Sequence, residues 1–266
     1  MTLLIVGSSG LVGRHVVAAL PVEDARDTIV RWCRDRDGDF LNTRDRRETL
    51  RRFRPNKVLQ LGWANTGIPS YEFHPDHDSW MKATAEFIGE TREADAWIGV
   101  VSSVADSRDS PTGMSPYRRA KMELRERFAH LGNDEGVALF RPSYLFSQFA
   151  LRPRVLRDLL LHPDPLSFKF DSPDRKHDFI HAIDAGSGIV QAMKHGCSGE
   201  INVCTGRLIS VREFAEAILN DVELVRPDQA AEEWGERSKE TPEALLGLGW
   251  KPTMSISLFR RHQHNP

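Results

Sequence analysis

The stretch "TLLIVGSSGLVGRHVVAAL" (residues 2–20) decides the fold class. It opens with a short continuous apolar run, which is typical of a strand buried on both faces of a parallel sheet. Glycines follow at once with the spacing G-x-x-G-x-x-G, and the sequence then continues with helical periodicity. One such glycine permits a tight turn, another lets main-chain N–H groups approach a pyrophosphate, and the third lets helix and strand pack closely. This strand–turn–helix context predicts a dinucleotide-binding loop. The expected cofactor contacts in it are Gly7, Ser9, Gly10, Leu11, Val12 and Gly13.

Strand and helix patterns alternate downstream of this loop. Apolar, β-branched runs at 27–34, 57–63 and 96–103 predict strands, and residues 80–94 are helical by pattern. Such alternation predicts an α/β fold, a Rossmann-type doubly wound parallel sheet with helices on both faces. From about Gln148 this alternation gives way to segments separated by prolines.

We therefore expect two parts in the chain. The first is an NAD(P)-binding domain over 1–147, its sheet completed by later segments near 177–205. The second, over 148–266, is mainly a small C-terminal substrate-binding lobe.

The composition restricts the classes of partner. The 266 residues carry a formal net charge of −2, which offers no field to gather nucleic acid or an anionic membrane. Three cysteines, Cys33, Cys197 and Cys204, have no metal-ligand spacing, so reduced thiols are the simplest account. No apolar run approaches the roughly 18 residues that span a bilayer. The first residues also lack the basic flank and cleavage site of a signal peptide. We expect a cytoplasmic protein with no metal site.

The end of the second predicted strand bears on the choice of cofactor. An acid there binds the ribose 2′-hydroxyl of NAD, whereas an arginine suits the 2′-phosphate of NADP. The segment "IVRWCRDRDGDF" puts Arg34 where the acid would sit, with Arg36 close by, although a register shift of one residue would bring in Asp35. NADP is therefore preferred, and NAD stays open. Asp39 and Phe40 are expected to cap the adenine, with Asp39 accepting from its amino group.

A second signal is "SPYRRAK" (residues 115–121) at the start of another predicted helix. Tyr117 and Lys121, at i and i+4, lie on one helix face. A phenol with a pKa of about 10 is a poor acid–base catalyst at neutral pH unless a cation stabilises its phenolate. Lys121 would supply that cation and hold the nicotinamide ribose. Ser102 and Ser103, at the end of a core strand, offer a hydroxyl to orient a carbonyl. The alternatives are a plain surface pair and two strand-end hydroxyls that cap the main chain.

Motifs in the right order along nearly the whole chain resemble the extended branch of the short-chain dehydrogenase/reductase superfamily. More narrowly, the chain resembles the NAD-dependent epimerase/dehydratase family, which modifies sugar nucleotides. The matching segments are "GSSGLVG", "VVSS", "YRRAK", "FRPSYLFS", "RKHDFIHAIDAG", "GEINVCTGRLISVREFAEAI" and "LGLGWKP". The resemblance implies that Tyr117 is the general acid, that Lys121 lowers its pKa, and that Ser103 bonds the carbonyl oxygen.

Further candidates lie outside these catalytic positions. The other expected cofactor contacts are Leu61, Gly62, Pro142 and Tyr144. The expected substrate contacts are Ser102, Trp63, Arg152 and Arg175, the arginines because an anionic substrate needs cations.

The chain departs from the family pattern in ways that bear on the reaction. Ser103 and Tyr117 are only 14 residues apart, closer than is usual in the extended branch. Trp63 stands in place of a small residue beside the cofactor. Val104 and Ala105 stand where dehydratases carry an Asp–Glu pair, so elimination is not expected.

These features favour NAD(P)H-dependent reduction of a keto group, on a nucleotide-linked deoxy sugar. An NAD-dependent sugar-nucleotide epimerase is the alternative within enzymes. A cofactor-binding sensor or scaffold without turnover is the alternative from another class. The helix expected over 77–90 could contribute to a homodimer face or serve as core.

Overall fold

A parallel sheet forms the centre of the computed structural model, which describes residues 1–21, 28–64, 71–106, 114–130, 136–147, 172–220 and 236–253. Six strands run parallel in the order β2-β1-β3-β4-β5-β9. They are β1 (Thr2–Val6), β2 (Thr28–Arg31), β3 (Lys57–Gln60), β4 (Trp97–Val101), β5 (Val137–Pro142) and β9 (Gly199–Val203). The predicted Rossmann-type doubly wound sheet is confirmed.

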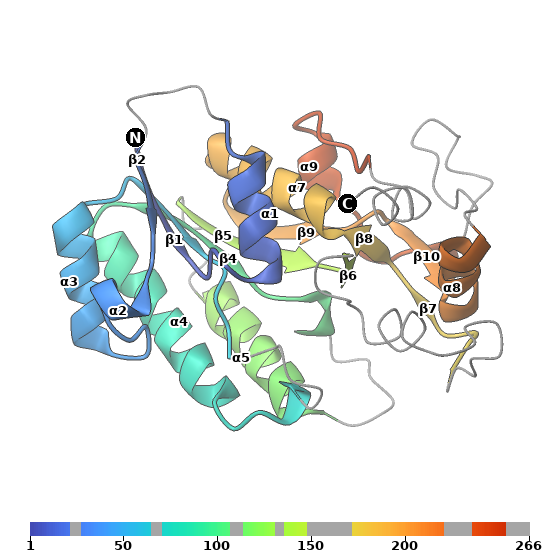
Figure 1. Ribbon diagram of the computed structural model, residues 1–266, viewed down its shortest axis with the longest axis horizontal. Helices are drawn as coiled ribbons and strands as arrows, with labels where there is room; N and C mark the ends of the chain where they lie inside the picture. Colours follow the sequence, from blue (N-terminus) through green and yellow to red (C-terminus); the bar gives the residue numbers. More distant parts are fainter. Residues whose placement is uncertain are drawn as a thin grey trace.

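Helices cover both faces of this sheet (Figure 1). One face carries α1 (Leu11–Ala19) and α7 (Ala182–Lys194). The other carries α3 (Thr43–Phe53), α4 (His77–Glu93) and α5 (Pro116–His130). Alternate residues of β1 serve the two layers: Leu3 and Ile5 pack under α1 and α7, whereas Leu4 and Val6 pack toward the other helices. Three one-turn helices follow strands or precede long helices: α2 (Arg34–Asp37), η1 (Tyr71–Phe73) and η2 (Val104–Asp106).

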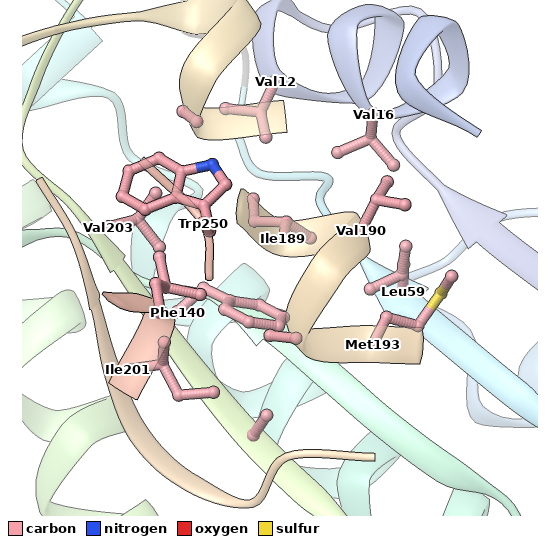
Figure 2. Close-up of a cluster of buried hydrophobic side chains, with 14 of the residues drawn as sticks. Val12, Val16, Leu59, Phe140, Ile189, Val190, Met193, Ile201, Val203 and Trp250 are labelled. Atoms are coloured by element: carbon pink, nitrogen blue, oxygen red, sulfur yellow. The ribbon is translucent and has the colours of Figure 1, made fainter. Parts of the chain in front are cut away.

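The layer of α1 and α7 is completed by the late segment around Trp250. Gly186 of α7 lies so close to α1 that a Cβ there would be 2.6 Å from the carbonyl carbon of His15. The Trp250 indole packs beside Ile189 and Val203 (Figure 2), and its Nε1 donates to Ser187 Oγ at 2.9 Å. A short helix, α9 (Glu243–Leu246), brings this segment back to the sheet.

A smaller assembly stands at the carboxyl ends of β5 and β9. Its elements are β6 (Tyr144–Phe146), β7 (Lys176–His177), β8 (Phe179–His181), β10 (Arg207–Ser210), α8 (Val211–Asn220) and β11 (Glu236–Arg237). β6 pairs with β8, and β7 and β11 flank β10. The buried Asp178 joins it to the main sheet, because its carboxylate accepts from Ser143 Oγ at 2.9 Å, from Thr205 N at 3.0 Å and from Gly206 N at 2.7 Å.

Two further observations bear on the sequence expectations. The chain returns to the main sheet as α7 and β9 before it enters β10, and the domain division at 147/148 stays a prediction. Among the residues described, no helix has both the length and the apolar character that a membrane crossing requires.

Candidate functional site

The glycine loop lies where the order of the strands reverses. β2 lies on one side of β1 and β3 on the other, and ligands of doubly wound sheets bind beyond the carboxyl ends of the strands at such a point. Gly7 follows β1 with φ of 79°, and a Cβ on it would be 2.5 Å from the main-chain nitrogen of Gly62. A Cβ on Gly13 would be 2.1 Å from the carbonyl oxygen of Gly7. Only glycine fits at these two positions.

The loop and the first turn of α1 form a cradle for an anion. Gly10 is the N-cap of α1, no side chain caps the helix, and its first turn holds no acid. Ser9 and Gly10 are exposed, and the Ser9 carbonyl accepts from Arg14 Nη2 at 3.1 Å. Uncapped N–H groups and the partial positive charge of a helix N-terminus suit a pyrophosphate. The pyrophosphate half of a nicotinamide dinucleotide therefore fits this part of the chain, where Val12 and Gly13 are buried.

The segment after β2 carries the exposed Arg34 and a buried carboxylate, that of Asp37, which is bonded within the protein. β2 pairs with β1 from Thr2 opposite Thr28 to Ile5 opposite Arg31, and Arg34 begins α2 three residues later. The Arg34 side chain is 79% exposed. The Asp37 carboxylate is fully buried and accepts from Cys33 N at 2.8 Å and from Arg36 Nη2 at 2.7 Å. Asp37 is thus bonded within the protein and is not open to a ribose.

The residues expected around an adenine have partners of their own. Asp39 Oδ2 accepts from Arg34 Nη2 at 2.6 Å, and its Oδ1 accepts from Leu41 N at 3.0 Å. The Phe40 ring is buried and stacks on Trp80 with centroids 5.2 Å apart. Phe40 can therefore reach a ligand only with its main chain. Contacts of Asp39 and Phe40 with an adenine stay predictions.

The two serines after β4 differ in exposure. Ser102 is buried, and its hydroxyl donates to Asp106 Oδ2 at 3.3 Å. Ser103 is half-buried, and its Oγ accepts from Ala105 N at 3.1 Å, as in a turn capped by serine. Ser103 is therefore the more accessible hydroxyl of the pair.

Tyr117 and Lys121 lie one turn apart at the start of α5. Ser115 Oγ accepts from Arg118 N at 3.3 Å, and Pro116 takes the first helical position, so a serine cap and a proline begin the helix. Lys121 is buried, and its Nζ donates to the carbonyl oxygen of Val101 at 3.0 Å. This bond docks α5 on the end of β4. The structure thus brings Tyr117 and Lys121 to the strand end from which Ser102 and Ser103 follow.

The electrostatics of Lys121 suit a residue that tunes a phenol. Burial lowers the pKa of Lys121 to about 7, and the Asp106 carboxylate acts in the opposite direction. The Nζ atom is 5.8 Å from the centroid of the Tyr117 ring, and a cation at this position stabilises a phenolate.

Aromatic side chains that sequence reasoning missed surround Tyr117. The rings of Tyr71 and His77 meet the Tyr117 ring edge-on, each with centroids 5.4 Å apart. His77 is buried, its Nδ1 accepts from Trp63 Nε1 at 3.0 Å, and burial lowers the pKa of its imidazole. No pattern in "YEFHPDHDSW" distinguishes these two residues from ordinary helix-start residues, because only tertiary packing brings them to Tyr117.

A buried ion pair beneath the serines was missed as well. Arg141 Nη2 donates to Asp106 Oδ1 at 2.7 Å, and Arg141 Nη1 donates to Asn202 Oδ1 at 2.8 Å. Asp106 follows Ser103 by three residues, yet its carboxylate is bound to Arg141 and Ser102. It is therefore not placed to shuttle protons as the acids of a dehydratase do. The sequence offered one indication of this pair, Arg141 of "FRP", which is a charged residue at the end of an apolar run.

The remaining candidates lie near strand ends, in the smaller assembly or outside the described ranges. Leu61 and Gly62 follow β3 beside Gly7, and Pro142 is buried at the end of β5. Tyr144 is 43% exposed and its ring lies 4.0 Å from that of His177. Burial and the nearby Arg175 guanidinium lower the pKa of His177 to about 4. Arg175 is exposed, and Arg152 lies outside the residues that the structure describes.

The sequence and fold match known proteins as follows. Residues 3–204 match the family model described as "NAD dependent epimerase/dehydratase family". No curated protein matches the chain.

Several solved structures share the fold. A dTDP-4-dehydrorhamnose reductase from Clostridium acetobutylicum is 15% identical with a TM-score of 0.68, and the match covers 98% of each chain. ADP-L-glycero-D-manno-heptose-6-epimerase from Helicobacter pylori is 17% identical with a TM-score of 0.72, covering 100% of this chain and 96% of that one. UDP-glucose 4-epimerase from Thermus thermophilus, in complex with NAD, is 16% identical with a TM-score of 0.66, covering 100% and 99%. At these identities the likeness shows a shared fold.

Proposed function

The chain belongs to the NAD-dependent epimerase/dehydratase family, and we propose that it is an NAD(P)H-dependent ketoreductase that acts on a nucleotide-linked keto sugar. The observation that carries this proposal is the placement of Tyr117 and the buried Lys121 on one side of α5, docked on the end of β4 next to Ser103. The glycine loop after β1 opens at the same edge of the sheet.

Each of the three side chains has a distinct task in this proposal. The nicotinamide cofactor, when bound, supplies a hydride to the carbonyl carbon. Tyr117 Oη gives its proton to the carbonyl oxygen, and the Lys121 ammonium stabilises the phenolate that remains. Ser103 Oγ donates a hydrogen bond to the same oxygen and so orients the carbonyl. Lys121 also holds the nicotinamide ribose, and Leu61, Gly62, Pro142 and Tyr144 line the cofactor.

Reduction is preferred over elimination and epimerisation for two reasons. The Asp106 carboxylate is bound to Arg141, so no free acid follows Ser103 within η2. The exposed Arg34 at the end of β2 suits a 2′-phosphate, and NADP is a cofactor that arrives reduced and leaves oxidised. The sugar-nucleotide substrate is supported by the reductase and the epimerases that share the fold.

The proposal extends to the rest of the molecule. Residues 148–266 mainly form the substrate lobe, with Arg175 and Arg152 toward the diphosphate and with Trp63 and Ser102 near the sugar. The protein works in the cytoplasm, and α4 and α5 can form the face of a homodimer.

Cofactor titration followed by turnover tests the proposal. We expect the purified protein to bind NADPH more tightly than NADH, to retain no dinucleotide on purification, and to oxidise NADPH with a nucleotide-linked 4-keto sugar. Tyr117→Phe should lower turnover by about 10²- to 10⁴-fold, because the proton donor is lost, while the Kd for NADPH stays unchanged. Unchanged turnover in this variant would remove Tyr117 from the chemistry. Tightly retained NAD would move the epimerase to first place.

A further inference from the structure

Trp63 connects the proposed catalytic lysine with a buried histidine. The Lys121 ammonium nitrogen lies 3.3 Å from the centroid of the indole ring. On its other side, the indole Nε1–H donates to His77 Nδ1 at 3.0 Å, with the two rings inclined by 25°. The ring is therefore fixed by a hydrogen bond at its nitrogen while its face meets a cation.

His77 is itself held in one orientation and one protonation form. Its Nε2 lies 2.5 Å from the Tyr71 carbonyl oxygen and must donate to it, so Nδ1 is the acceptor for Trp63. The imidazole is 1% exposed, and burial lowers its pKa, so the neutral form prevails. The edge of this ring also meets Tyr117. One packed cluster thus touches both members of the Tyr117–Lys121 pair.

Few other groups stabilise the positive charge of Lys121. Within the described part of the chain, no carboxylate lies within ion-pair distance of its Nζ, which donates to the Val101 carbonyl. The titratable groups facing it are Asp106 of η2, His77 of α4 and Tyr117 of α5. Asp106 is bonded to Arg141. Besides the Val101 carbonyl, the Trp63 indole face is then the contact that stabilises the buried ammonium, and a desolvated cation–π contact is a strong one.

We propose that Trp63 is a positioning residue whose indole face keeps the Lys121 side chain charged and fixed beside Tyr117, with His77 orienting the indole. The catalytic consequence rests on the proposed function, because it matters only if Lys121 supports Tyr117 in proton transfer. The interaction itself is a property of the protein without ligands. It also explains why a large ring stands here at the expense of space beside the cofactor loop.

Titration of Lys121 by NMR tests this inference. The chain has 8 lysines, so the ¹³Cε resonance of Lys121 can be assigned in lysine-labelled protein by its loss in Lys121→Met. Trp63→Leu should lower the pKa of Lys121 by about one unit, since the contact is lost from a desolvated site. Trp63→Phe, which keeps an aromatic face, should lower it by clearly less. Trp32→Leu, a change of the same size beside β2, is the matched control and should leave it unchanged.

Two results would overturn the inference. One is an unchanged pKa of Lys121 in Trp63→Leu, and the other is an equal fall in the Leu and Phe variants, which would assign the effect to packing alone. If Trp63→Leu does not fold, the wild-type spectrum decides, because protons on Lys121 Cε above an indole face must be shifted upfield by its ring current. None of these measurements uses substrate or cofactor, so they stand apart from the Tyr117→Phe turnover test.

Discussion

At Gly13 the structure leaves no room for any side chain. Its neighbour is the main-chain oxygen of Gly7, which cannot move without breaking the turn that follows β1. Sequence spacing alone predicted a glycine loop here, but not which positions are sterically strict. A Cβ at Gly10 would be 3.3 Å from the same oxygen, so that position is far less restricted.

Gly13→Ala should therefore destabilise the protein and abolish dinucleotide binding. Overpacking against rigid main chain costs about 1–3 kcal/mol of unfolding free energy, which urea denaturation measures. The matched control is Gly89→Ala in α4, where a Cβ would meet nothing within 4 Å. That variant should gain up to about 1 kcal/mol, as expected for glycine in a helix interior. Equal stability of the two variants would contradict this account.

The proposed catalytic residues were partly within reach of sequence reasoning. Tyr117 and Lys121 share a helix face because their spacing of four residues is local, and α5 does carry both. Tyr71 and His77 meet them because η1 and α4 pack on α5, and Trp63 reaches them from the segment after β3. No local sequence pattern encodes these contacts.

At the level of elements, the ends of β4, β5 and β9 are joined by one buried arginine. Arg141 of β5 reaches Asp106 of η2 and Asn202 of β9, and Asn202 in turn donates to the Thr241 carbonyl at 3.2 Å. The short segment carrying Ser102 and Ser103 is thereby fixed against three strands. Removing Arg141 takes away the hydrogen-bonded cation of the buried Asp106 carboxylate and leaves it only the Arg125 guanidinium, whose Nη1 is 3.5 Å away.

Arg141→Met should cost about 3–5 kcal/mol of unfolding free energy, the usual effect of breaking a buried pair at one partner. Arg127→Met is the matched control, because the Arg127 side chain is 50% exposed and pairs with the exposed Glu123 on the same helix. Its loss should cost at most about 1 kcal/mol. Denaturant unfolding of both variants measures these losses. Comparable losses of unfolding free energy would mean that the buried pair stabilises the fold no more than an exposed pair does.

The long elements could be predicted and the short ones could not. β1, β3 and β4 coincide with predicted apolar runs, because burial on both faces leaves a continuous apolar sequence. The edge strand β2 was predicted from its β-branched residues, although of its four residues only Val30 is buried. β2 ends at Arg31, three residues before the predicted end, since residues 34–37 turn into α2. β6, β7, β8 and β11 have two or three residues each, too few for a period to show, and their pairing depends on segments far apart in the chain.

The stability of the whole molecule should depend on pH because of Lys121. Its pKa is lowered from 10.5 to about 7 in the folded protein, so between these values the unfolded chain binds a proton that the folded protein has released. Stability therefore rises with pH in this window, by about 1.4 kcal/mol per unit, and the penalty is fully present below pH 7.

Lys121→Met removes the cost of burying a charged lysine, so comparison with the wild type measures that cost. At pH 6.5 the variant should be more stable than the wild type by a few kcal/mol, and the gap should narrow steadily toward pH 9. Urea unfolding across this range measures it. Lys251→Met, at an exposed lysine, should run parallel to the wild type. If the stability difference between Lys121→Met and the wild type does not depend on pH, folding does not lower the pKa of Lys121.

The packing of α1 against α7 and Trp250 also sets an order of events during synthesis. α1 is synthesised early, yet Val12 and Val16 pack with Ile189, Val190 and Trp250, which are synthesised more than 170 residues later (Figure 2). At ribosomal rates of about 5–20 residues per second, roughly ten to fifty seconds pass between the synthesis of α1 and that of Trp250. During that interval the apolar side of α1 lacks the contacts that cover it in the folded protein.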